Sequence, residues 1–211
     1  MDAAEAADHI RETAEEEAHE RQDRFKSRAA VVIAVIAALL AMCELGAQNS
    51  KDSMIDLNIK ASDAWNFYQA KNQRQTAYKL AAEDLKRQLA DPAVAGAQRN
   101  AVEADVAKYE KTVARYEDEP DPKAPGDPTK GEGKKQLSER AKHYEEARDQ
   151  AQERIESFDF GQMLLQLAIV LGSVSILSTS RPLLVGAMAL GAGGAVLVIN
   201  GAFLHLPLPL G

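Results

Sequence analysis

Two stretches with almost no charge, residues 29–45 and 160–204, most restrict how this chain can fold. The residues before and between them, 1–28 and 47–157, are dense in charge. A helix needs about 20 mainly apolar residues to cross the hydrocarbon core of a bilayer. We therefore predict an all-α membrane protein with three transmembrane helices, whose long polar middle is attached to the bilayer at both ends.

The predicted segments follow from where charge appears and disappears. They are a charged helical leader (1–28), a first transmembrane helix (29–46), a polar helical domain (47–157), a second transmembrane helix (158–178), a third (183–204) and a tail (205–211). The link Ser178–Pro182 leaves room only for a tight turn, so the second and third helices should be antiparallel neighbours. Asp159, at the start of the second helix, predicts an N-cap.

The first apolar segment also has two interpretations as a processing signal. A cleavable signal peptide is disfavoured, because the leader is long and acidic. The run Leu39-Leu40-Ala41-Met42-Cys43 is similar to a lipoprotein box, but Met42 replaces the small residue expected before the cysteine. We favour a retained membrane helix and leave open whether Cys43 is modified. Cys43 is the chain's one cysteine, so no intramolecular disulfide can form.

Small residues recur along one side of each predicted membrane helix. Such stripes let helix backbones approach closely in lipid. The residues that we expect to make these contacts are Ala34, Ala38, Gly172, Ala187, Gly191 and Ala195.

A 4-3 repeat begins in the polar domain at Leu57 and keeps one edge of a long helix facing a partner. Its positions are Leu57, Ala61, Ala64, Tyr68, Lys71, Gln75, Tyr78, Ala82, Leu85 and Leu89. Similar repeats run from 102 to 116 and from 137 to 158. A Pro/Gly loop over 119–135 separates them. We predict a long, coiled-coil-like antiparallel helical hairpin, with a three-helix zigzag as the alternative. The repeat is compatible with pairing within one chain or between chains.

The sequence Asp63-Ala64-Trp65-Asn66-Phe67-Tyr68-Gln69-Ala70-Lys71 resembles the hallmark of an uncharacterised family of bacterial membrane proteins, domain of unknown function 4337. The resemblance extends over most of the chain. It implies a membrane location and this helical architecture, and it implies no activity. We interpret this region as a packing layer or a contact between subunits. The residues assigned to it are Trp65, Tyr68, Gln69, Lys71, Gln75 and Tyr78.

The sequence carries no signature of catalysis. Phosphate-binding glycine loops and nucleophile motifs are missing, and the four histidines lack zinc-site spacing. The net charge of -7 argues against nucleic-acid binding. We therefore expect a protein without cofactors, whose partners are the lipid bilayer and a second copy or another membrane protein. Our first hypothesis is a structural or scaffolding protein that oligomerises through its stalk. The alternative is a sensor or adaptor subunit that needs a separate output partner.

Basic residues near the predicted membrane helices predict the orientation. Arg21, Arg24, Lys26 and Arg28 precede the first helix, and Arg181 lies in the turn between the second and third. Three spans place these regions on one side of the membrane, and the positive-inside rule makes that side the cytoplasm. We therefore expect a bacterial inner-membrane protein whose N-terminus is cytoplasmic and whose stalk and C-terminus are periplasmic.

A topology reporter inserted at Lys130 checks this orientation. We expect it to report an extracytoplasmic position, because Lys130 lies in the polar domain. A cytoplasmic signal would contradict the assignment.

Overall fold

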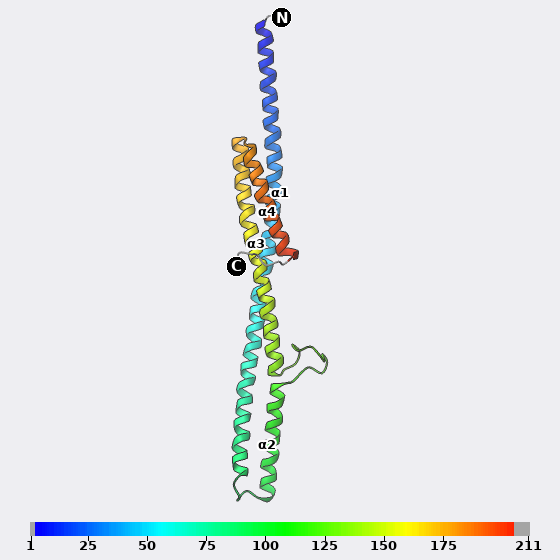
Figure 1. The fold of residues 1–211 in the computed structure, drawn as a ribbon, viewed down its shortest axis with the longest axis vertical. Coiled ribbons are helices and arrows are strands. Elements are labelled where there is room, and N and C mark those ends of the chain that lie inside the picture. Colours follow the sequence, from blue (N-terminus) through cyan, green and yellow to red (C-terminus); the bar gives the residue numbers. More distant parts are fainter. Residues whose placement is uncertain (1–2, 205–211) are drawn as a thin grey trace. The chain divides into compact units, whose positions relative to one another are not determined.

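The computed structural model describes residues 3–204, and this part of the chain is all-helical (Figure 1). Its α-helices are α1 (Ala3–Leu89), α2 (Gly96–Glu117), α3 (Lys134–Ser178) and α4 (Arg181–Ile199). A short π-helix, η1 (Asn200–Leu204), continues from α4.

Helices α1 and α3 each run without a break across boundaries predicted from charge. Helix α1 contains the leader from Ala3 onward, the first apolar segment and the polar domain up to Leu89. Helix α3 likewise runs through Asp159, so the predicted N-cap at that residue is wrong. The physical reason is that neither junction contains a proline, and the first proline in the chain is Pro92. A change from charged to apolar side chains does not by itself interrupt a helix.

Proline and glycine mark the places where the helices do end. Asp91 Oδ1 accepts a hydrogen bond of 2.9 Å from the backbone N–H of Ala93, and Gly96 has a φ of 58° at the start of α2. In the link between α2 and α3, Gly131 has a φ of 123° and pairs with Pro120 in an isolated antiparallel bridge. Glycine adopts these backbone conformations at little cost. The link between α2 and α3 closely matches the predicted Pro/Gly loop.

The chain divides into two compact units. The apolar unit comprises Met1–Asp52 and Gln150–Gly211, and the polar unit comprises Ser53–Asp149. The predicted polar domain (47–157) is longer than the polar unit at both ends. Ala47 belongs to the core of the apolar unit, where it is 4% exposed.

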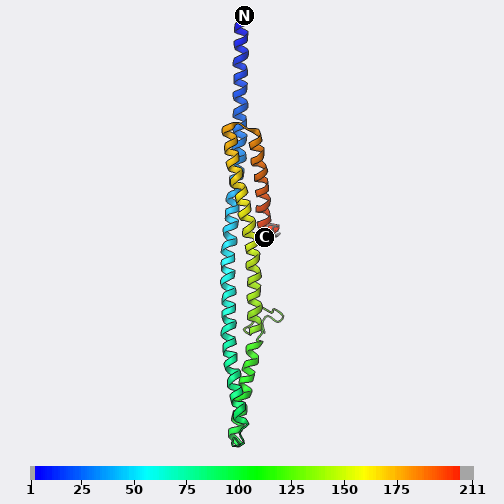
Figure 2. The same cartoon turned by 60° about the vertical axis from the view of Figure 1, so that its left-hand side comes forward.

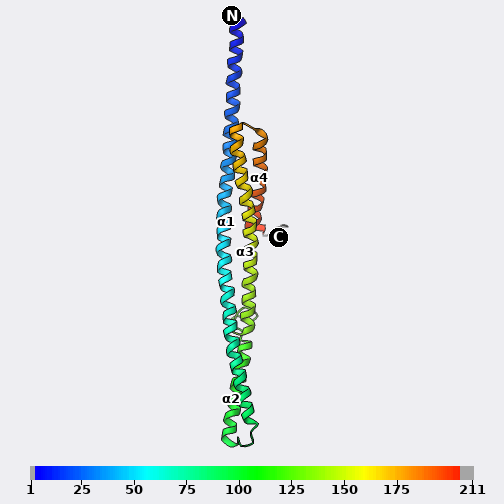
Figure 3. The same cartoon turned by 90° about the vertical axis from the view of Figure 1, so that its left-hand side faces the viewer.

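Close helix packing holds the apolar unit together. In this unit, α4 lies beside the apolar half of α3 (Figures 2 and 3). Its buried core cluster is Ile36, Cys43, Ala47, Phe158, Leu165 and Ala168. The Cys43 thiol donates a hydrogen bond of 3.2 Å to the carbonyl of Phe158. Asn200 Nδ2 donates to Ser157 Oγ at 3.0 Å, so two buried polar side chains satisfy each other.

Three helices, α1, α3 and α4 with its continuation to Phe203, contain segments long and apolar enough to cross a membrane. This follows from length and composition, and it agrees with the predicted number of spans. Large apolar side chains such as Val31, Leu167 and Val185 are exposed on these segments. Exposed apolar surface of this kind suits contact with lipid.

In the polar unit, α1 lies beside α2 and the polar part of α3 (Figure 3). We call the 4-3 positions from Leu57 to Leu89 the inner stripe. Every position of the inner stripe is buried or half-buried. Ala61, Ala64 and Gln75 are the most enclosed among its first positions, at 3%, 4% and 1% exposure. The repeat therefore identified the face of α1 that packs against the other helices of its own chain.

Gly46 offers a test of the packing in the apolar unit. A Cβ atom at Gly46 would lie 2.6 Å from the ring of Phe158, whereas a Cβ at Gly186 would meet nothing within 4 Å. We expect Gly46→Ala to destabilise the apolar unit by about 1–3 kcal/mol, the usual cost of overpacking. Thermal unfolding of the protein in detergent measures this effect, and Gly186→Ala is the control. Equal midpoints for the two variants would contradict the packing.

A buried polar layer in the polar unit

Gln75 is the centre of a polar layer that joins the helices of the polar unit. Its side chain is 1% exposed, although it lies in an otherwise mainly apolar stripe. Gln75 Nε2 donates to the carbonyl of Val113 and to Glu117 Oε2, both at 2.9 Å. Gln75 Oε1 accepts a hydrogen bond of 2.8 Å from Lys134 Nζ. Both ends of the amide are thus satisfied, which is the condition for burying it at low cost.

Lys134 completes this layer from the first turn of α3. Its ammonium group lies 3.0 Å from Asn72 Oδ1 and 3.1 Å from Glu117 Oε2, in addition to its contact with Gln75. An ammonium group has three N–H donors, so each can be used. The ammonium group of Lys134 on α3 therefore connects Asn72 and Gln75 of α1 with Glu117 of α2.

Glu117 supplies the negative charge of the layer. The hydrogen bond from Gln75, and then that from Lys134, holds the pKa of the Glu117 carboxyl below its usual value. The carboxylate therefore stays ionised opposite Lys134 at neutral pH. Next to it, hydrogen bonds from Gln136 and Lys135 lower the pKa of Asp118 in the same way.

Lys71 makes a second polar contact, one turn before Gln75. Its ammonium group lies 3.2 Å from Glu119 Oε2, donates to the carbonyl of Glu132, and lies 5.4 Å from the centre of the Tyr116 ring. Lys71 therefore attaches both ends of the α2–α3 loop to α1. From the other side, Arg140 donates to the carbonyls of Thr129 and Gly131 at 2.8 and 2.7 Å.

Aromatic contacts lie on both sides of the polar layer. The Tyr78 ring contacts those of Tyr109 and Tyr116, with centroid distances of 5.4 and 5.9 Å. Trp65 and Tyr68 pack edge to face at 5.6 Å. Trp65 Nε1 also donates to Glu145 Oε1 at 2.9 Å, so the indole reaches α3. Such pairs contribute roughly 0.5–1.5 kcal/mol beyond the area they bury.

The residues predicted for this region divide into two groups. Trp65, Tyr68, Lys71, Gln75 and Tyr78 all lie at contacts within the chain, whereas the predicted Gln69 is exposed. Sequence reasoning missed the partners of Gln75. Lys134 was assigned to the Pro/Gly loop, although it is the first residue of α3, and Glu117 is one of many acidic residues. A polar residue in the middle of an apolar repeat is the one signal that could have prompted a search for such partners.

The small residues predicted for membrane helix packing also divide into two groups. A Cβ atom at Gly172 would lie 2.8 Å from Ile33, and one at Gly191 would lie 3.0 Å from Ile36. Ala187 is fully buried, and Ala195 is half-buried. In contrast, Ala34 and Ala38 are exposed.

The polar layer has the character of a structural element. Between residues 3 and 204, no three His, Cys, Asp or Glu side chains come close enough together to hold one metal ion. An open groove of about 570 Å³ beside Gln75 is also lined by Lys86 and Glu110, whose charged atoms lie 2.7 Å apart. The contacts of the polar layer fix the register of α2 and α3 along α1.

Replacing Lys134 tests the energetic role of the layer. We expect Lys134→Met to destabilise the polar unit by about 1–3 kcal/mol, because it leaves the buried oxygen of Gln75 without a donor. The control is Lys135→Met, whose side chain is exposed and pairs with Asp118 at the surface. Urea unfolding followed by circular dichroism measures both, and equal losses of stability would contradict the role of the layer.

The comparisons with known proteins concern the whole chain. A family model, Domain of unknown function (DUF4337), matches residues 25–204. The matched range includes the Trp65–Lys71 block, so the resemblance expected from that block is confirmed. Comparison with curated proteins and with solved structures gives no match. The chain belongs to the family of the domain of unknown function DUF4337.

Proposed function

We propose that this protein is a non-enzymatic integral membrane scaffold. It consists of three membrane helices and a polar helical hairpin outside the bilayer. The observation that carries this proposal is how the chain uses its contact surfaces. The inner stripe is buried within the chain, while other uncharged faces of α1 stay exposed. The contacts among the described residues that join α1 to α2 and α3 support this proposal.

The order of contacts supports an antiparallel, coiled-coil-like hairpin. Lys71 contacts Glu119, Gln75 contacts Val113, and Lys86 contacts Glu110, so later residues of α1 meet earlier residues of α2. The contact of Trp65 with Glu145 continues this order into α3. Helices α2 and α3 therefore follow one another along α1, which favours the hairpin over the three-helix zigzag.

We propose a bacterial inner membrane as the location, with the N-terminus in the cytoplasm and the polar unit in the periplasm. The basic residues near the membrane helices motivate this orientation. A contact in the apolar unit supports the placement of both basic regions on the same side, because Gln22 Nε2 lies 3.3 Å from Thr179 Oγ1. The end of the leader and the turn before Arg181 are thus neighbours, as two regions on one side of a bilayer should be.

Self-association is the step that would make such a protein a scaffold. Because the inner stripe is already used, copies must meet through other surfaces. Ala34 and Ala38 are exposed on the apolar part of α1, and small residues there allow close helix contact in lipid. The partner is then a second copy in the same membrane.

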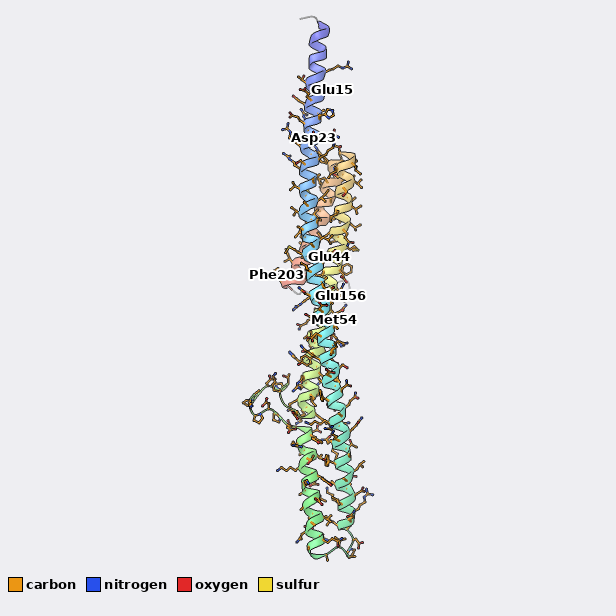
Figure 4. All side chains as sticks on the ribbon, turned by 180° about the vertical axis from the view of Figure 1, so that it is seen from behind. Glu15, Asp23, Glu44, Met54, Glu156 and Phe203 are labelled. Carbon is orange, nitrogen blue, oxygen red and sulfur yellow. The ribbon has the colours of Figure 1, made fainter. Side chains whose placement is uncertain are left out.

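An adaptor for a separate partner protein is the second candidate. The α2–α3 loop favours it, since this loop projects from the helices of the polar unit (Figure 4). Arg140 and Lys71 hold the loop by its backbone carbonyls, which leaves side chains such as Lys123 and Lys130 exposed. A fixed and exposed loop suits recognition by another protein.

The native mass of the protein in nanodiscs separates the two candidates. We expect a defined oligomer, and we expect Ala38→Leu to reduce its mass by preventing close approach of α1 helices. The control is Ala189→Leu, at an exposed alanine of α4. A monomeric wild-type protein would contradict the scaffold and leave the adaptor as the better account.

A further inference from the structure

A second 4-3 repeat follows the outer side of α1 in the polar unit. We call it the outer stripe. It consists of Ile55, Ile59, Ser62, Asn66, Gln69, Gln73, Thr76 and Leu80, all of which are exposed. Ile55, Ile59 and Leu80 have exposures of 54%, 55% and 55%, so both ends of the outer stripe present aliphatic surface to the outside of the chain.

The outer stripe contains no charged residue, although charged and exposed side chains lie close to it on the same helix. The charged and exposed side chains that surround it include Asp56, Lys60, Asp63, Arg74, Lys79, Glu83 and Asp84. A face that only meets water is normally the most highly charged part of an amphipathic helix. A 4-3 spacing keeps a stripe along one edge of a helix over its whole length, about 37 Å from Ile55 to Leu80. The outer stripe therefore has the pattern of a helix contact that the chain itself does not fill.

We propose that the outer stripe joins two copies of this chain, with their α1 helices parallel and in register. This inference rests on the proposed self-association in a membrane and adds the surface and geometry by which it occurs. Two copies inserted the same way in one bilayer present their α1 helices in parallel, so each residue of the outer stripe meets its own counterpart. A charged residue in that position would face a like charge. The uncharged outer stripe avoids this.

The chemistry of the outer stripe is self-complementary. Isoleucines occupy its first two positions and a leucine its last, and these bury apolar surface against themselves. At its centre, Asn66, Gln69 and Gln73 carry amides, which both donate and accept hydrogen bonds and can therefore pair with identical amides. A polar residue at a helix contact also fixes register and the number of strands, as a buried asparagine does in parallel coiled coils.

The flanking charges agree with the parallel arrangement. Lys79 and Asp84 lie on opposite sides of the outer stripe and are five positions apart in the sequence. In a parallel pair of helices with a 4-3 repeat, flanking residues with this separation lie beside each other across the contact. Lys79 of one copy would therefore approach Asp84 of the other. Within its own chain, Asp84 already pairs with Arg87 at 2.6 Å, so the contact would extend an existing ion pair.

The apolar unit gives an independent observation. Ala34, Ala38 and Ala41 are exposed there and are themselves spaced at 4-3 intervals. These are positions at which helices can approach closely in lipid.

Cysteine cross-linking in native membranes tests the geometry with matched pairs of neighbours. The stripe variants are Ile59→Cys and Gln73→Cys, and the controls are Lys60→Cys and Arg74→Cys. All four positions are exposed, and each control is one residue from its stripe variant. Since a disulfide needs Cα atoms within about 7 Å, only residues that face each other across the contact can form one. Mild oxidation should link the stripe variants into dimers several-fold more than the controls.

The chain's own cysteine, Cys43, is a source of background cross-links that the experiment must control. Cys43 is buried, so each variant is made both with Cys43 present and with Cys43→Ala, and the same pattern is expected in both. Equal cross-linking of stripe and control variants, or cross-linking of the controls alone, would overturn the inference. The native mass of the unoxidised variants separates the two proposals. An oligomer without stripe-specific cross-links overturns the outer stripe alone, and a monomer overturns the proposed self-association as well.

Discussion

The continuity of α1 and α3 is the constraint on which the rest of the structure depends. Each of these helices carries an apolar part and a charged part, and neither contains a proline at the junction. One helix must therefore satisfy two different packing rules. In the apolar unit, glycines and alanines allow the backbones to approach, whereas in the polar unit a 4-3 repeat selects the contact face.

The buried polar layer around Gln75 explains how the polar unit selects one alignment. Apolar residues alone would tolerate shifts of α2 and α3 along α1. The polar side chains of Gln75 and Lys134 do not tolerate such shifts. Moving α2 or α3 by one turn along α1 would leave buried donors or acceptors unpaired, at a cost of roughly 1–3 kcal/mol for each group. Lys71 adds to this by attaching Glu119 and the carbonyl of Glu132 to the same part of α1. The polar layer thus favours one register of α2 and α3 along α1.

Local features of the sequence predicted the inner stripe, the Pro/Gly loop and the three candidate spans, because each depends on residue spacing, on proline and glycine, or on a run of uncharged residues. The distribution of charge did not predict the continuity of the helices. Charge is a property of side chains, and the backbone of α3 continues as a helix through Asp159. The local features also missed Lys134, whose role depends on neighbours distant in the sequence. Ala34 and Ala38 show a further limit. A small-residue stripe predicts that a face can pack closely, but it does not say whether the partner is another helix of the chain or another molecule.

Use of the inner stripe within one chain is the central claim, because it decides which faces of α1 are available to a second copy. Zero-length carbodiimide cross-linking of a mixture of unlabelled and ¹⁵N-labelled protein, followed by mass spectrometry, tests it directly. Lys86 Nζ and Glu110 Oε1 lie 2.7 Å apart and can be joined as an amide. We predict that linked peptides containing these two residues are either fully unlabelled or fully labelled. Mixed peptides at statistical abundance would show that the inner stripe pairs between chains and would contradict the account.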